Sequence, residues 1–151
     1  MYFIDRNQIE KALSHMEELL ALYKEEEKWS EDLIHALGLA RLSHVVIEAI
    51  IDVGNTMIDG FIMRDPGGYD DIIDIMEDEK VITPEMSVPL KQVIGLRQMI
   101  VREFVDVETE SIIDVLDASY ESLLLFPTKV RYYLENELGP VSAFLPADEV
   151  K

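Results

Sequence analysis

The chain has 151 residues, and its 31 acidic side chains against 13 lysines and arginines give a formal net charge of −18. This length is typical of one compact domain, and an apolar content of 48% is too high for a disordered acidic tail. The charge excludes strong nonspecific binding to nucleic acid or anionic lipid, because lysine and arginine supply that affinity. The lack of cysteine excludes disulfides, thiolate metal sites and a thiol nucleophile.

The sequence has no segment typical of a signal peptide or a membrane anchor. Its first residues lack a basic flank followed by an apolar stretch. The longest stretch without Asp, Glu, Lys or Arg is residues 138–147, which is well short of the ~20 apolar residues that span a bilayer. We therefore expect a soluble, cytoplasmic protein.

The first predicted helix begins after Asp5, a capping residue, with Gln8 three residues later as in a capping box. The charged run at residues 24–28 is typical of a solvated helix end. Between these limits, apolar side chains recur at helical spacing and predict one buried face. They are Ile9, Leu13, Met16, Leu20 and Tyr23.

A second, longer helix is predicted from Ser30, a plausible N-terminal cap, toward Asp59 and Gly60. Its apolar residues cover much of its circumference, which is typical of a helix buried at the centre of a bundle. They are Leu33, Leu37, Ala40, Val45, Ile47, Ile50, Ile51, Val53 and Met57.

A polar stripe crosses this second helix. Its members follow one another at intervals of three or four residues, so they lie near one face. The stripe is either an outer face with ion pairs to neighbouring helices or the wall of a polar groove. The six residues are Arg41, His44, Glu48, Asp52, Asn55 and Asp59.

The remaining sequence predicts a turn and three further helical segments. Residues 64–68 contain a proline and two glycines that end helical structure, and residues 69–80 read as a short acidic helix. The next helix starts at Thr83 and Pro84, with Ser87 and Pro89 as a second possible start, and continues at least to Phe104. The last one runs from residues 108–109 to Gly139 and Pro140, with Pro127 kinking or restarting it.

These segments predict an all-α fold, a bundle of four main helices plus one short helix. The predicted helical domain covers residues 1–139, followed by a C-terminal tail at residues 140–151. No phosphate-binding glycine loop, paired metal-ligand histidines or strained nucleophilic serine is present. No cofactor or metal ion is therefore predicted.

The sequence Gly95-Leu-Arg97-Gln98-Met-Ile-Val-Arg102-Glu-Phe104 is the most informative motif. With it, the chain resembles the HepT-like branch of the HEPN superfamily, and within it the YutE-like group. The resemblance extends from Asp5 to Leu138. It includes residues 47–55 of the second helix, the turn at residues 66–70, and Val81-Ile82.

The resemblance implies a homodimeric all-α protein encoded beside a minimal nucleotidyltransferase. In active members, a motif written R-N-x-x-x-H-x-Y places Arg and His of both protomers across a dimer cleft, where they cleave RNA without a metal. The partner enzyme modifies the motif Tyr with adenylate. Arg97 matches the motif Arg, and Gln98 occupies the polar position.

Two positions depart from that motif. Arg102 replaces the motif His and stays protonated near pH 7, so it cannot act as a general base. Phe104 replaces the motif Tyr and has no hydroxyl to accept adenylate. Arg97 and Arg102 either pair with carboxylates of the second helix, Glu48 and Asp52, or line a ligand cleft, and both arrangements can hold together.

These residues predict a non-catalytic binding or regulatory dimer with a degenerate ribonuclease motif at Arg97, Gln98 and Arg102. Its ligand would be RNA bound locally at the dimer cleft, a nucleotide, or a nucleotidyltransferase-type partner. The predicted binding residues are His44, Glu48, Asp52 and Phe104. The alternative is an active, metal-independent endoribonuclease toxin of a toxin–antitoxin system, in which His44 transfers the proton. A purely architectural dimer is a third hypothesis.

Overall fold

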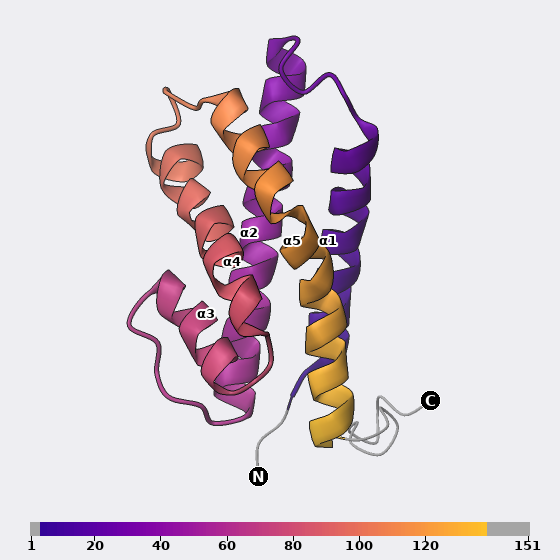
Figure 1. Cartoon of the computed structure of the whole chain (residues 1–151), viewed down its shortest axis with the longest axis vertical. Helices are drawn as coiled ribbons and strands as arrows, with labels where there is room; N and C mark the ends of the chain where they lie inside the picture. The colour runs from indigo at the N-terminus through magenta and orange to yellow at the C-terminus, as the bar shows by residue number, and fades with distance from the viewer. Residues whose placement is uncertain (1–3, 139–151) are drawn as a thin grey trace.

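The computed structural model of the chain describes residues 4–138, which form helices and no strand (Figure 1). The four main helices and the short third helix confirm the predicted all-α bundle. A short π-helix, η1, continues directly from the fourth helix. The elements are α1 (Arg6–Glu25), α2 (Leu33–Gly60), α3 (Tyr69–Asp78), α4 (Pro84–Arg97), η1 (Gln98–Arg102) and α5 (Thr109–Leu138).

Helix α2 is the central element, because α1, α3, α4, η1 and α5 all pack against it. By length and composition it is the one described helix that could cross a membrane. Much of its surface, however, is buried against the other helices, among them the fully buried Ile47, Ile50 and Met57. The core helix of a soluble bundle has the same length and apolar character.

The start of α1 confirms the capping prediction. The Asp5 carboxylate accepts a hydrogen bond from the backbone N–H of Gln8 at 3.0 Å, which satisfies one donor of the first turn. All five of the predicted apolar residues are buried against the rest of the bundle. The local spacing of these residues therefore identified the face that packs.

The start of α2 differs from the prediction in two ways. Asp32, not Ser30, is the cap, and its carboxylate accepts from the backbone N–H of His35 at 2.8 Å. Leu33 and Leu37, predicted as part of the buried surface, are 72% and 62% exposed. The reason is visible in Figure 1, where the first turns of α2 project beyond the ends of α1 and α5.

Helix α3 packs closely on α2 and α4, and its position depends on one glycine. A Cβ atom added at Gly54 of α2 would lie 2.4 Å from Cγ2 of Ile72 in α3. Because real Cβ contacts are never so short, only glycine allows the two helices to approach at this point. The acidic helix ends at Asp78, two residues before the predicted end at Lys80.

The fourth helix begins as predicted, with Thr83 as the N-cap and Pro84 in the first helical position. The prediction that it continues to Phe104 is wrong, because α-helical geometry ends at Arg97 and η1 ends at Arg102. Phe104 lies in the turn that follows.

The last helix begins at Thr109, as predicted, and continues through Pro127 without restarting. Figure 1 shows that the axis of α5 bends part-way along. The predicted stop at Gly139 and Pro140, and the tail at residues 140–151, lie outside the described residues.

Candidate functional site

The polar stripe of α2 lies on a side of the helix that the rest of the bundle leaves open. All six stripe residues are exposed or half-buried, whereas their neighbours Ser43, Val46 and Ile47 are fully buried. The interpretation as an outer face with ion pairs to neighbouring helices therefore fits the protomer. The stripe borders α4 and η1, which carry the arginine motif.

Arg97 is the half-buried centre of this region. It is the last residue of α4, and its side chain is 22% exposed. Its Nη2 atom lies 3.5 Å from Oε1 of Glu48, which confirms the expected pairing with that carboxylate. Its guanidinium carbon lies 5.0 Å from the ring centroid of Tyr69, a cation–π distance. The guanidinium therefore connects α2, α3 and α4.

The ion pair of Arg97 is loose compared with those of two other arginines. Arg131 donates four side-chain hydrogen bonds to Glu10 and Glu17 at 2.7–2.9 Å. Arg64 donates two hydrogen bonds to the Asp71 carboxylate, at 2.7 and 2.8 Å. Arg97 makes no hydrogen bond of this kind within residues 4–138, and its Nε atom is buried without a partner. Because Nε is buried, only the two Nη atoms can reach a ligand, and two such donors are suited to bind a phosphate oxygen pair.

Glu48 links Arg97 to His44. The Nε2 atom of His44 lies 3.5 Å from the same Glu48 oxygen that faces Arg97. The carboxylate thus holds a guanidinium and an imidazole together at one point of the stripe. Asp52, one turn further along α2, is exposed and its side chain makes no ion pair among the described residues.

Gln98 and Arg102 bound the π-helix. Its backbone turn is closed by the N–H of Glu103 donating to the carbonyl of Gln98 at 3.1 Å, a span of five residues. In an α-helix, residues five apart differ in direction by about 140°. Because a π-helix has more residues per turn, η1 is expected to reduce that difference between Arg97 and Arg102.

Arg102 is exposed and makes no hydrogen bond or ion pair within the described part of the chain. Of the two alternatives for Arg102, pairing with Glu48 or Asp52 therefore does not hold in the protomer. Gln98 is also exposed, and its amide donates to Glu103 at 3.2 Å. The carboxylates of α2 thus leave the Arg102 guanidinium available to a ligand.

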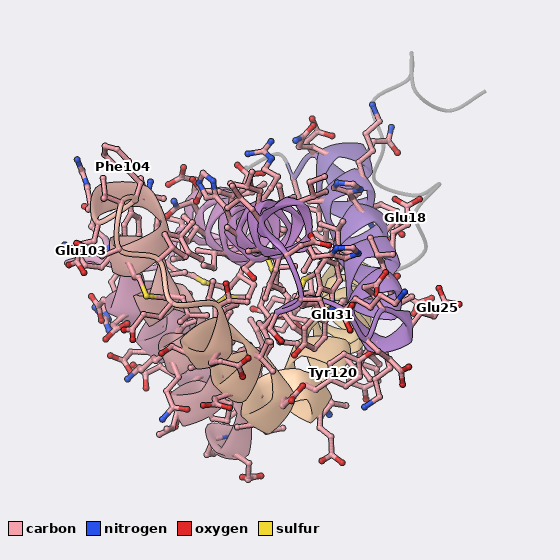
Figure 2. All side chains as sticks on the ribbon, turned by 90° about the horizontal axis from the view of Figure 1, so that it is seen from above. Glu18, Glu25, Glu31, Glu103, Phe104 and Tyr120 are labelled. Atoms are coloured by element: carbon pink, nitrogen blue, oxygen red, sulfur yellow. The ribbon has the colours of Figure 1, made fainter. Side chains whose placement is uncertain are left out.

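Phe104 lies outside the bundle core. It is 71% exposed, and Figure 2 shows Phe104 and Glu103 projecting from the edge of the bundle where η1 ends. An aromatic side chain so placed has no packing role within the protomer. The binding role predicted for Phe104 stays a prediction.

A pocket of about 560 Å³ lies between the start of α3 and the end of α4. Because α3 runs antiparallel to α4, the first turn of α3 faces the last turn of α4 (Figure 1). This pocket is not apparent from the sequence, because only the fold brings Tyr69 against Arg97. It is lined by Gly68, Tyr69, Asp70, Asp71, Asp74, Ile94, Gly95, Arg97 and Gln98.

Two of the three pocket aspartates are neutralised by cations. Asp74 lies 2.6 Å from Nζ of Lys91. Asp71 accepts two hydrogen bonds from Arg64 and one from the backbone N–H of Gly67, and these lower its pKa to about 2. Asp70 makes no hydrogen bond or ion pair within residues 4–138. Over the same residues, no group of three His, Asp or Glu side chains is placed to hold a metal ion.

The Asp71→Asn variant is expected to be less stable than the wild type at neutral pH but not at strongly acid pH. A carboxyl whose pKa is lowered by folding stabilises the folded state above its unfolded pKa of about 3.9, and this contribution is lost as the pH falls toward 2. Thermal melts from pH 7 to 2 should show the difference in Tm narrowing over pH 4 to 2. A difference independent of pH would contradict the role of the Arg64–Asp71 pair. Asp70→Asn is the matched control.

Residues 9–130, which include every site residue named above, match the family described as "Ribonuclease HepT-like". The chain belongs to the HepT-like family. It is 47% identical over 144 residues to "Putative RNase YutE" of Bacillus subtilis (strain 168), covering 95% of this chain and 99% of that protein. The solved structure of YutE, a cytosolic protein of unknown function, matches with a TM-score of 0.91 over 95% of this chain and 100% of that one.

Two more distant structures share the HepT-like fold. One is a toxin–antitoxin crystal structure with AMP-PNP, at 17% identity and a TM-score of 0.69, covering 81% of this chain and 96% of that one. The other is a tri-AMPylated Shewanella oneidensis HEPN toxin in complex with an MNT antitoxin, at 17% identity and a TM-score of 0.71, covering 82% and 96%. At this identity the likeness is one of fold.

Proposed function

We propose that this HepT-like chain forms a homodimer that binds a phosphate-bearing ligand, either RNA or a nucleotide, at Arg97 and Arg102 without cleaving it. The observation that carries the proposal is the state of the two motif arginines. Arg97 is held in place by Tyr69 and Glu48 while its guanidinium hydrogen bonds stay unused, and Arg102 has no protein partner in residues 4–138. Two available guanidinium groups form a local anion site on an acidic protein.

The loss of catalysis follows from the chemistry at position 102. Cleavage next to a ribose 2′-hydroxyl needs a group that accepts and donates protons near pH 7. Arginine remains protonated in proteins and cannot do this. The same site can therefore stabilise phosphate charge but cannot move the proton.

The purified protein is expected to leave total RNA and short oligomers intact in the presence of EDTA, while still binding them through Arg97. Gel electrophoresis of the RNA measures cleavage, and fluorescence anisotropy of a labelled oligomer measures binding. We expect Arg97→Ala to weaken binding about 10-fold or more, since a charge-assisted bidentate contact is lost. Cleavage that disappears in Arg97→Ala would overturn the non-catalytic proposal.

The proposed homodimer is supported by exposed apolar side chains at one end of the bundle. They lie in the first turns of α2 and in the turn after η1, both toward the upper end of the bundle in Figure 1. Exposed apolar patches are typical of interaction surfaces. The residues are Leu33, Ile34, Leu37, Phe104 and Val105, each at least 62% exposed.

Light scattering is expected to give the mass of a dimer at micromolar concentration, and Ile34→Lys to shift the mass toward that of a monomer. A charge placed in a buried apolar interface costs several kcal/mol, of order 2 or more. Val88→Lys is the matched control, because Val88 is 62% exposed at the other end of α4. A wild-type monomer, or equal effects of both variants, would contradict the proposed interface.

A nucleotidyltransferase-type protein in the cytoplasm is the proposed partner class. The support is the fold likeness to a HEPN toxin solved with an MNT antitoxin and the relative described as cytosolic. Because Phe104 offers no hydroxyl, such a partner would bind this chain without modifying that position.

The second candidate is an active, metal-independent endoribonuclease toxin. It is favoured by the cluster in which Glu48 faces both His44 and Arg97 at 3.5 Å, since an imidazole there can transfer protons next to a bound phosphate. In that case, producing the protein alone would arrest growth, and His44→Ala would relieve the arrest while the protein remains folded.

A further inference from the structure

The pocket between α3 and α4 contains a cation–π pair of planar groups, Tyr69 and Arg97. Tyr69, the first residue of α3, is 46% exposed, and the guanidinium of Arg97 lies over its ring at 5.0 Å. Nothing in the bundle core requires an aromatic ring at this exposed position. Tyrosine rings and guanidinium planes are the surfaces on which proteins stack nucleic-acid bases.

The pocket beside this pair is kept open by glycine. Gly95 lies within α4, where glycine costs helix stability relative to alanine. A Cβ added at Gly95 or Gly68 would meet no atom within 4 Å, so packing does not require glycine at either position. The missing side chains leave a space of about 560 Å³ next to the Tyr69–Arg97 pair. This volume falls within the range of small-molecule pockets.

One carboxylate in the pocket is available for a ligand. Asp71 and Asp74 are held by Arg64 and Lys91, whereas Asp70 makes no hydrogen bond or ion pair within residues 4–138. A carboxylate has two acceptor oxygens, and guanine presents two adjacent N–H donors on one edge. Uracil has a single N–H there, flanked by carbonyls that a carboxylate repels.

We propose that this pocket binds the base of a nucleotide, preferably guanine, by stacking on the Tyr69–Arg97 pair and by hydrogen bonds to Asp70. The phosphate of the same nucleotide lies on the outer side of Arg97, toward Arg102. The proposal rests on the proposed phosphate-binding function of Arg97. It adds a base-recognition subsite made by α3, outside the arginine motif.

The test compares GMP, UMP and ribose 5-phosphate as probes in isothermal titration calorimetry with the full chain. GMP is expected to bind about fivefold or more tightly than ribose 5-phosphate, because a stacked base contributes at least that factor. Tyr69→Ala should abolish this advantage, whereas Tyr69→Phe should keep it. Tyr132→Ala is the matched control, because Tyr132 is an exposed tyrosine of α5.

Two further variants test the pocket without removing the ring. Gly95→Leu should weaken GMP binding by filling the space while leaving ribose 5-phosphate binding unchanged. Asp70→Asn should reduce the preference for GMP over UMP about fivefold or more, because an amide has only one acceptor atom. The affinity for the dinucleotide GpU, compared with that for GMP, then tests whether the pocket also accepts a guanine base that is part of an RNA chain. Circular dichroism melts exclude unfolding of each variant.

The outcomes separate this inference from the proposed function. If no probe binds, or if Arg97→Ala changes nothing, the phosphate site itself is absent and the proposed function fails. If ribose 5-phosphate binds through Arg97 as tightly as GMP, and Tyr69→Ala has no effect, the phosphate site stands and the base subsite is wrong. Equal binding of GMP and UMP that depends on Tyr69 would overturn the guanine preference.

Discussion

Replacing Arg102 with histidine is expected to raise the metal-independent ribonuclease activity of the chain above that of the wild type. The substitution restores a side chain that titrates near neutral pH beside Arg97. General acid–base catalysis contributes about 10²–10⁴-fold, so cleavage should rise by that order above the wild type. The measurement is the rate of cleavage of a labelled RNA oligomer in EDTA.

The matched control is Arg102→Ala, which removes the guanidinium without supplying a proton-transfer group. It should stay inactive, and Arg97→Ala in the Arg102→His background should abolish the new activity. Cleavage by Arg102→His should rise with pH as the imidazole loses its proton, over a range near its ordinary pKa of about 6.5. Equal inactivity of the histidine and alanine variants would show that η1 does not place position 102 beside the scissile phosphate.

Replacing Gly54 with alanine is expected to destabilise the protein by about 1–3 kcal/mol, even though alanine favours helix formation. The added Cβ would lie 2.4 Å from Cγ2 of Ile72 and 3.4 Å from Sδ of Met76. Ile72 is β-branched and stiff in a helix, so α3 itself must move. Thermal melts followed by circular dichroism should show Tm lowered by roughly 2–10 °C.

Gly95→Ala is the control, and it is expected to raise the stability of the protein rather than lower it. A Cβ at Gly95 meets no atom within 4 Å, so only the gain in helix propensity remains, up to about 1 kcal/mol of added stability. The double variant Gly54→Ala/Ile72→Ala should cost less than the sum of the single variants, because the clash is absent. A stabilising Gly54→Ala would contradict the close approach of α2 and α3.

The element boundaries could be predicted where short-range chemistry decides them. Asp5 caps α1, and Thr83 with Pro84 starts α4, because capping and proline geometry depend on residues within one turn. The predicted cap of α2, Ser30, was wrong, although Asp32, two residues later, is also of a residue type that caps helices. The carboxylate of Asp32 makes the capping bond, and that choice depends on the backbone path out of α1.

The exposure of the first turns of α2 could not be read from their composition. Leu33 and Leu37 have the spacing and the apolar character of core residues, yet no helix of the protomer covers them. Burial depends on how far the neighbouring helices extend. The apolar periodicity of α2 carries no information about the lengths of those helices. The π-turn of η1 is a further case, because nothing local in residues 98–102 distinguishes it from an α-helix.

The sequence alone determined the helical class of this HepT-like protein and the identity of its motif residues. It also determined that position 102 carries no group able to transfer a proton, since that is a property of arginine itself. Only the tertiary structure decided that the Arg97 guanidinium lies over the Tyr69 ring, lies 3.5 Å from Glu48 and makes no hydrogen bond among residues 4–138. Helical periodicity and capping act over a few residues, whereas contacts among α2, α3 and α4 depend on how whole helices pack.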